Sequence, residues 1–210
     1  MNASIEENKQ KVLTLLRQIK REGMDKFIEW LQTTDYFTCP ASSKFHSNYE
    51  GGLCAHSLNV YNRFLQLLKT EYGDDYASHC PDESIILMGL MHDLCKVGTF
   101  VKETRNVKLY SESGFKQDSK GNFDWVEKEV YAVDDTLPYG HGEKSVYILS
   151  GFIRLTRLEA MSINWHMGGF DYRVKGGSYA LSDVFYTYPV ALLLHIAVME
   201  ATYLDESCIK

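Results

Sequence analysis

Five side chains in this sequence have the chemistry of a divalent-metal site. Two are adjacent, His92 and Asp93, and the other three are the separate histidines His56, His141 and His166. Imidazole nitrogens and carboxylate oxygens are the usual protein ligands of zinc, manganese, iron, cobalt and nickel. The residue types therefore predict a centre that holds one or two divalent transition-metal ions, whose identity the sequence leaves open.

The expected secondary structure places the first three of these residues at one end of two helices. His56 belongs to an apolar stripe on a helix that begins near Gly52, so its side chain should face the interior. Asp93 falls near the end of a helix that begins at about Asp82, where a buried carboxylate needs a cation or hydrogen-bond donors. Each residue also has an alternative without a metal. His56 could be a hydrogen-bonded core histidine, and Asp93 could pair with Lys96 at the C-terminus of the helix.

The other two histidines also lie where helices begin or end. His141 follows Gly140 and opens a helix expected over 141–154, and His166 ends a helix expected over 156–166. A glycine-rich loop, Met167–Tyr179, comes next, where backbone could approach a ligand closely. Both histidines have alternatives without a metal. His141 could cap the start of its helix, and His166 could place a positive charge at the C-terminus of its helix, where the helix dipole favours one.

Basic and hydroxyl side chains near these residues could contact a phosphate. Lys96 follows His92 by one helical turn and Asp93 by three residues, so all three can point at one spot. Lys144 and Ser145 follow the opening histidine of their helix by three and four residues, on the same face.

Two further cations are weaker candidates for the same task. Arg105 and Lys175 lie in segments expected to be mobile beside the site. An interpretation of both as solvated surface charges is equally good.

The order of elements predicts a mainly α fold in one domain over residues 1–210. Two helices form an N-terminal extension over 1–34, and a last helix begins near Pro189. Between the helices, residues at about 100–135 have strand-like composition with turn signals, which predicts a β-hairpin or meander insertion. This insertion mixes aromatic and basic residues that could cover a base and its phosphate. The alternative is a small sheet that packs its aromatic side chains on the helices.

Composition narrows the class of protein. The 210 residues are 45% hydrophobic, which suits a packed core. No apolar run is long enough to cross a bilayer, the polar N-terminus is unlike a signal peptide, and five cysteines without a CxxC pair suit reduced thiols. We therefore expect a cytoplasmic protein with no membrane partner. A formal net charge of −6 disfavours binding to duplex nucleic acid.

The motifs carry a family resemblance over about residues 45–205. Gly51-Gly52-Leu53 followed by His56, then His92-Asp93-Leu94 with Lys96, then His141-Gly142 and His166, resembles the HD-domain superfamily of metal-dependent phosphohydrolases. The pattern is most similar to the dinuclear members, such as the HD domains of some 3′–5′ exoribonucleases and HD-GYP phosphodiesterases. The resemblance implies an HD-type helical bundle.

It also implies two metal sites that share Asp93. The first would use His56, His92 and Asp93, and the second would use Asp93, His141 and His166. The family's last ligand is an aspartate in the final helix, and Val198 stands at that position here. A valine cannot bind a metal, so we expect the first site to be weaker than in the family.

The function that this resemblance implies is hydrolysis of a phosphoester or phosphodiester. The substrate would be a small phosphorylated molecule such as a nucleotide, or a short single-stranded nucleic acid, with Asp93 and Lys96 in catalytic roles. Two alternatives stay open: an HD-fold diiron oxygenase, and a regulatory protein that binds a metal or nucleotide with weakened activity because of Val198. The oligomeric state is not predicted.

Overall fold

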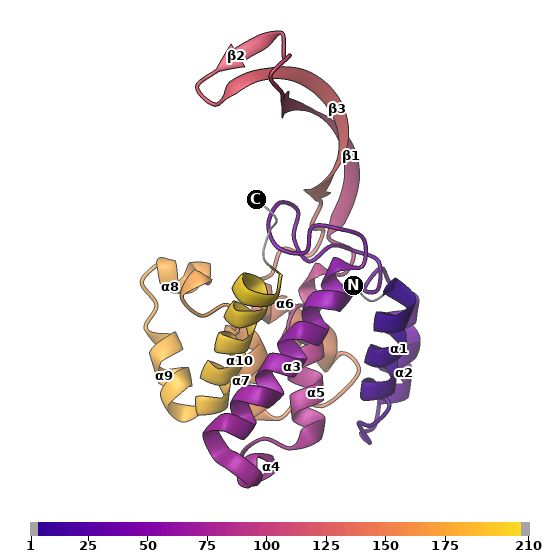
Figure 1. Ribbon diagram of the computed structural model, residues 1–210. Coiled ribbons are helices and arrows are strands. Elements are labelled where there is room, and N and C mark those ends of the chain that lie inside the picture. Colours follow the sequence, from indigo (N-terminus) through magenta and orange to yellow (C-terminus); the bar gives the residue numbers. More distant parts are fainter. Residues whose placement is uncertain (1–3, 207–210) are drawn as a thin grey trace.

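The computed structural model describes residues 4–206, which form a helical bundle with one long β arm (Figure 1). The α-helices are α1 (Ile5–Leu16), α2 (Met24–Gln32), α3 (Gly52–Tyr72), α4 (Tyr76–His79), α5 (Asp82–Met91), α6 (His141–Ser150), α7 (Arg157–Trp165), α8 (Tyr172–Lys175), α9 (Ala180–Thr187) and α10 (Pro189–Glu200). The shorter turns are η1 (Gly73–Asp75), η2 (Leu94–Lys96), η3 (Gly168–Phe170) and the π-helical turn η4 (Ala201–Asp205). The strands are β1 (Phe100–Tyr110), β2 (Lys116–Asp118) and β3 (Gly121–Val133). The predicted mainly α fold with a β insertion is therefore confirmed.

Helix α5 is the centre of the bundle. Every residue from Ser84 to Met91 is buried, as expected of a helix that is apolar all round. It packs against α3, which packs in turn against α10 and α1. The end of α5 therefore opens into the middle of the bundle, where His92 and Asp93 follow.

The N-terminal helices are bound to the bundle by an ion pair as well as by apolar packing. Ser4 and Glu7 form a capping box at the start of α1, as the sequence predicts. Arg21, after α1, contacts the buried carboxylate of Glu159 at 2.7 Å. Glu159 also completes the capping box of α7, so one carboxylate joins the extension to a helix of the core.

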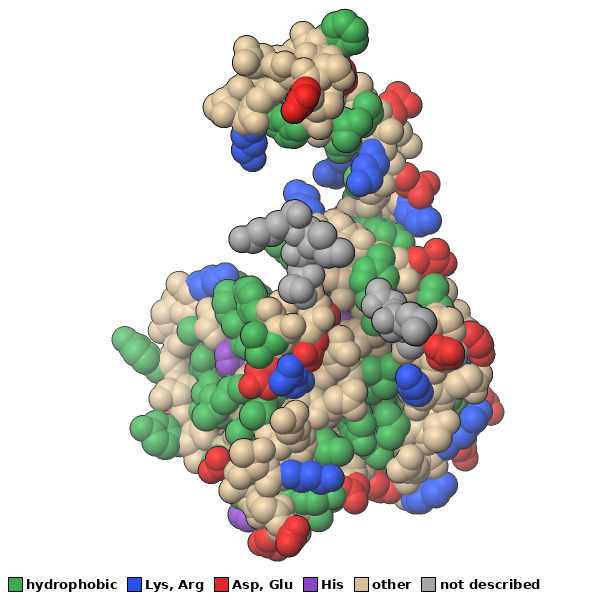
Figure 2. Space-filling view, in the orientation of Figure 1, with side chains coloured by type: hydrophobic (Ala, Val, Ile, Leu, Met, Phe, Trp, Pro, Cys, Tyr) green, Lys and Arg blue, Asp and Glu red, His purple; other side chains and the backbone are tan. Residues whose placement is uncertain are grey.

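The strands form a three-stranded antiparallel sheet that stands away from the helices as an arm (Figure 1). β1 pairs with β3 along its whole length, from Phe100 opposite Val133 to Tyr110 opposite Phe123. The aromatic side chains pack within the arm: the Phe123 ring lies 5.8 Å from Tyr110 and 5.7 Å from Trp125 between centroids. Side chains of both charges follow the arm (Figure 2). These three aromatic side chains therefore pack on one another, and the alternative that they pack on the helices is wrong.

Several predicted boundaries need correction. Helix α5 ends at Met91, so the helical spacing expected from His92 to Lys96 is not present, because Asp93 leaves the helical conformation and the turn η2 follows. The expected loop Met167–Tyr179 contains η3 and α8, the latter capped by Asp171. Helix α9 was not predicted, although Val184 gives it a buried face.

The cysteines and the apolar helices relate to the expectations from composition. Four cysteines are free and buried, namely Cys39, Cys54, Cys80 and Cys95; Cys208 lies outside the described residues. Within residues 4–206, no single helix is long and apolar enough to cross a membrane. The pair α9 and Pro189–Asp205 passes that test together by length and composition, but it is bent by 110°.

Candidate metal centre

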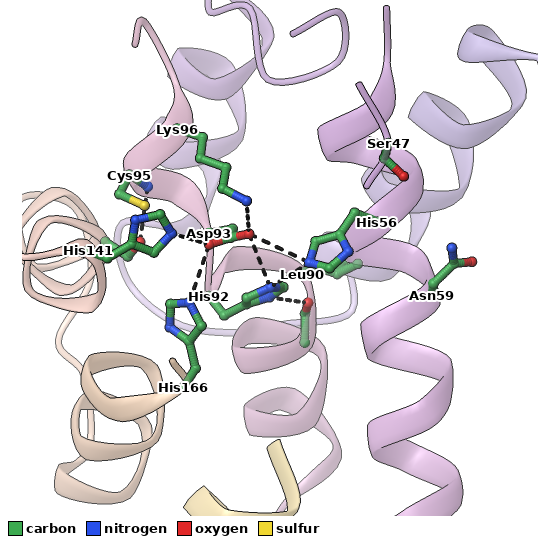
Figure 3. Close-up of polar contacts among 12 residues, drawn as sticks. Ser47, His56, Asn59, Leu90, His92, Asp93, Cys95, Lys96, His141 and His166 are labelled. Atoms are coloured by element: carbon green, nitrogen blue, oxygen red, sulfur yellow. Dashed lines mark hydrogen bonds and ion pairs between the residues drawn. The ribbon is translucent and has the colours of Figure 1, made fainter. Parts of the chain in front are cut away.

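The carboxylate of Asp93 lies at the centre of the four predicted histidines (Figure 3). Its Oδ1 atom is 2.8 Å from Nε2 of His141 and 3.3 Å from Nε2 of His166. Its Oδ2 atom is 3.6 Å from Nε2 of both His56 and His92. Each carboxylate oxygen thus faces one pair of histidines. The ligand-type atoms form a first triad (His56, His92, Asp93) and a second triad (Asp93, His141, His166), each within 4.8 Å.

The cluster is buried except on one side. The side chains of His92 and His166 are fully buried, and those of His56 and Asp93 are 1% and 3% exposed. His141 is 37% exposed. His141 is therefore the member of the cluster that faces solvent.

The backbone fixes which nitrogen of two rings carries the hydrogen. Nδ1 of His92 lies 3.0 Å from the carbonyl oxygen of Gly89, and Nδ1 of His166 lies 2.7 Å from that of Ile163. A carbonyl oxygen only accepts, so each Nδ1 must donate, and each neutral ring has a lone pair on Nε2. Nε2 of His166 is buried and makes no hydrogen bond, yet faces the carboxylate of Asp93. A cation between these two acceptors would stabilise the arrangement.

The ionisation of the cluster follows from burial and from its mutual charges. Burial lowers the pKa of His92 and His166, so both rings are neutral near pH 7. Although burial raises the pKa of Asp93, the nearby Lys96 and His92 hold it well below its usual value. Burial also opposes the charged form of His141, but Cys95 and Asp93 raise its pKa to about 10. Asp93, His92 and His166 are therefore in the forms that bind metals, whereas His141 is charged near pH 7 and would release a proton when a metal binds.

Lys96 contacts the same carboxylate. Its ammonium nitrogen lies 2.5 Å from Oδ2 of Asp93, and its side chain is 10% exposed. The predicted convergence of Lys96 and Asp93 is therefore present. It comes from the turn η2 rather than from a continuous helix.

Two glycines allow the histidine-bearing segments to approach closely. A Cβ on Gly142 would lie 2.3 Å from the carbonyl oxygen of Asn164, so only glycine lets α6 pack this tightly on α7. Gly168 has φ +53°, and a Cβ there would lie 2.4 Å from the His195 ring. His195 is paired through Nδ1 with the carbonyl oxygen of His166, at 2.8 Å. Sequence reasoning did not select His195, and no local pattern links it to the His166 backbone.

The two residues predicted to extend the site on α6 have other partners. Lys144 is buried, and its ammonium contacts Asp135 at 2.6 Å and the Thr99 hydroxyl at 3.1 Å. The Ser145 hydroxyl accepts a hydrogen bond from the Cys95 backbone N–H at 3.0 Å. Both side chains hold the segments around the arm and η2 in place.

The two weaker phosphate candidates are not brought to the centre. Arg105 is exposed on β1 and pairs with Glu103 of the same strand. Lys175 is exposed on α8, 5.8 Å from the Phe170 ring. Neither contacts any member of the two triads.

Val198 is half-buried on α10 and packs against the main apolar core. Val190 and Leu194, earlier on the same stripe, are buried. The face of α10 that holds these three residues is therefore turned inward, and α10 lies against α3, the helix that holds His56.

Three further polar residues surround His56 on the side away from Asp93, and sequence reasoning did not select them. Glu206 accepts a hydrogen bond from Nδ1 of His56 at 2.9 Å, from the Ser47 hydroxyl at 2.7 Å and from the Asn59 amide at 3.1 Å. Ser47 and Asn59 are visible beside the His56 ring in Figure 3. Glu206 is 150 residues from His56, and no local spacing links them.

A cavity of about 1670 Å³ lies between α1, the loop before α3 and α3 itself. Ser47, Asn59 and Glu206 are in its wall, whereas none of the four triad histidines is. The large cavity is therefore separate from the Asp93 cluster.

No family model, no curated protein and no solved structure matches this chain. The buried His/Asp groups could hold a metal ion.

Proposed function

We propose that this protein is a metal-dependent phosphohydrolase with an HD-type centre that holds two divalent ions. The observation that carries the proposal is the bare Nε2 of His166, buried without a hydrogen bond and 3.3 Å from an oxygen of Asp93. Such an arrangement is costly unless a cation lies between the two acceptors. The order of the motifs, similar to that of dinuclear HD domains, supports the same proposal.

The chain's own residues suit the two sites unequally. Asp93 would bridge them, since Oδ1 faces the second triad and Oδ2 faces the first. His141 and His166 would complete the second site, and His56 and His92 the first. A divalent ion bound there lowers the pKa of water and offsets the charge of a phosphoryl group. Val198 offers the first site no ligand, so that site is the weaker one.

Lys96 is the residue that we expect to contact a phosphate. Its ammonium has three N–H donors, and only one of them is needed for Asp93, the acceptor 2.5 Å away. The remaining donors lie beside the metal-binding carboxylate. A phosphate oxygen that enters past the half-exposed His141 would therefore meet both the centre and Lys96.

A panel of phosphomonoesters, nucleotides and short phosphodiesters tests the proposal, after chelator treatment and reloading with Mn²⁺, Co²⁺, Ni²⁺ or Zn²⁺. We expect metal-dependent hydrolysis that His141→Ala and His166→Ala abolish. His79→Ala is the matched control, because His79 is a surface histidine stacked on Tyr72. Iron with oxygen consumption would favour the oxygenase alternative. No metal and no turnover would favour the regulatory one.

A further inference from the structure

Glu206 lies directly behind one of the proposed metal ligands. Its Oε1 atom is 2.9 Å from Nδ1 of His56, while Nε2 of the same ring lies 3.3 Å from Nε2 of His92 and 3.6 Å from Oδ2 of Asp93. We propose that Glu206 is a positioning residue that fixes the tautomer and orientation of His56, so that Nε2 can bind the first metal. This inference rests on the proposed metal centre.

The chemistry of the ring explains why a carboxylate matters there. A neutral imidazole has one N–H and one lone pair, and the hydrogen bond at one nitrogen decides which nitrogen is free. A carboxylate can only accept, so it keeps the hydrogen on Nδ1 of His56. It also makes Nε2 a more basic ligand, as outer carboxylates do for metal-bound histidines.

Glu206 is itself held rigidly. Ser47 donates to Oε2 at 2.7 Å, Asn59 donates to Oε1 at 3.1 Å, and the carboxylate side chain is 4% exposed. Together with the contact from Nδ1 of His56, these hydrogen bonds fix the carboxylate in one orientation.

The loop that holds Ser47 includes a strained backbone conformation. Ser47 has φ +46°, and within residues 4–206 no other residue apart from glycine has a positive φ. This conformation costs energy. Gly52 packs on its backbone, since a Cβ there would lie 2.0 Å from the Ser47 carbonyl oxygen. The glycine pair before His56 therefore helps to place the hydroxyl that holds Glu206.

The position of Glu206 also relates to Val198. Glu206 is no substitute ligand for the missing aspartate on the Asp93 side, because it lies on the opposite nitrogen of His56. Its carboxylate would instead make Nε2 of His56 a stronger ligand. This would partly offset the loss of the fourth protein ligand at the first site.

The same atoms permit one competing arrangement. His46, His56 and Glu206 have ligand-type atoms within 4.8 Å of one another. Nε2 of His46 is buried without a hydrogen bond. An ion bound here would use Nδ1 of His56 and would remove the hydrogen that our proposal requires. The experiment must therefore separate a positioning carboxylate from a ligand.

Zinc titration followed by ¹⁵N NMR of the histidine rings makes this separation. In the metal-free protein we expect His56 to carry its hydrogen on Nδ1, and Zn²⁺ to shift its Nε2 signal. Glu206→Leu removes the acceptor and should weaken zinc binding at the first triad by about 10–100-fold. Glu206→Gln keeps an acceptor without the charge and should rescue part of the affinity. The His141 and His166 signals should respond to zinc as in the wild type.

Asp205→Asn is the matched control. Asp205 is the adjacent carboxylate and pairs with Arg63 at the surface, at 2.5 Å, so its loss should leave the ring signals unchanged. Thermal unfolding checks that each variant is folded, and Glu206→Gln suffices if the leucine variant is not. Unchanged zinc affinity in both Glu206 variants would overturn the proposal. So would a zinc-induced shift at Nδ1 of His56 that His46→Ala removes. Absence of phosphatase activity in the wild type would count against the proposed function alone, because tautomer and zinc affinity are measured without turnover.

Discussion

Nε2 of His166 and Oδ1 of Asp93 lie 3.3 Å apart in the interior of the bundle, and neither atom carries a hydrogen. His166 donates its only hydrogen to the Ile163 carbonyl, and burial keeps the ring neutral by lowering its pKa. No hydrogen bond joins these two acceptors, although the charged His141 and Lys96 both contact the same carboxylate. A divalent ion bound by Asp93, His141 and His166 would give the lone pair of His166 a partner.

Replacement of Lys96 should separate catalysis from metal binding. Lys96→Met keeps the apolar stem and removes the ammonium that contacts Asp93. We expect turnover to fall by 10-fold or more, or about 1.4 kcal/mol per decade, while the metal content is unchanged. Steady-state kinetics and metal analysis of the same preparation check this. Full activity with normal KM would assign Lys96 to pairing with Asp93 alone.

The β arm can be shortened at a defined register. Asn106 pairs with Glu127, so replacement of residues 107–126 by Asn-Gly should give a closed hairpin. Because Tyr110, Phe123 and Trp125 pack within the arm, we expect the melting temperature to change by only about 2 °C. Turnover of a small phosphomonoester should be unaffected. A large loss of stability would show that the arm supports the bundle. A raised KM restricted to nucleotides would show that it covers the substrate.

The Arg21–Glu159 pair should give the protein a distinct acid sensitivity. Burial opposes the charged form of Glu159, but Arg21, Ser84 and the Thr156 backbone lower its pKa below 4.5. A depressed carboxyl pKa stabilises the fold above the unfolded-state value, and this stabilisation is lost as pH falls through the folded-state value. Glu159→Gln should therefore cost about 3 kcal/mol at neutral pH, and the difference from wild type should shrink below about pH 4. Denaturant unfolding across this range checks it. A constant difference would contradict the assignment.

Restoring a carboxylate at position 198 tests the alignment of the last helix. The half-buried Val198 follows the buried Val190 and Leu194 on the inward stripe of α10. Val198→Asp should add a ligand to the first site, raise its metal affinity and increase phosphohydrolase activity. Without metal the buried carboxylate should lower stability. Thermal unfolding with and without Mn²⁺, together with metal titration, measures both effects. Equal destabilisation in both conditions, with no gain in metal affinity at the first site, would show that residue 198 does not face the metal.

Residues with regular spacing could be predicted from the sequence. His56 lies on the inner face of α3 because apolar residues recur around it at helical intervals. Lys96 meets Asp93 because three residues separate them on a turn. The capping box at Ser4 and the β insertion also follow local patterns. Composition and spacing contain the information that such local features need.

Contacts between distant segments could not be predicted in this way. Glu206 reaches His56 through the π-helical turn η4, which has no recognised sequence signal. Lys144 faces Asp135 at the base of the arm rather than the centre, since its orientation depends on how α6 packs. The close approach of His195 to Gly168 likewise depends on the angle of α10. Each of these features depends on tertiary packing that one sequence does not encode in a local pattern.

Direct measurement of bound metal tests the central claim. Chelator-stripped protein, reloaded with Zn²⁺ or Mn²⁺ and freed of excess, can be analysed by elemental mass spectrometry beside His166→Ala and the surface control His79→Ala. We predict two ions per chain in the wild type and in the control, and one ion in His166→Ala, whose second triad is incomplete. Equal metal content in all three proteins, or no bound metal in the wild type, would contradict the proposed centre.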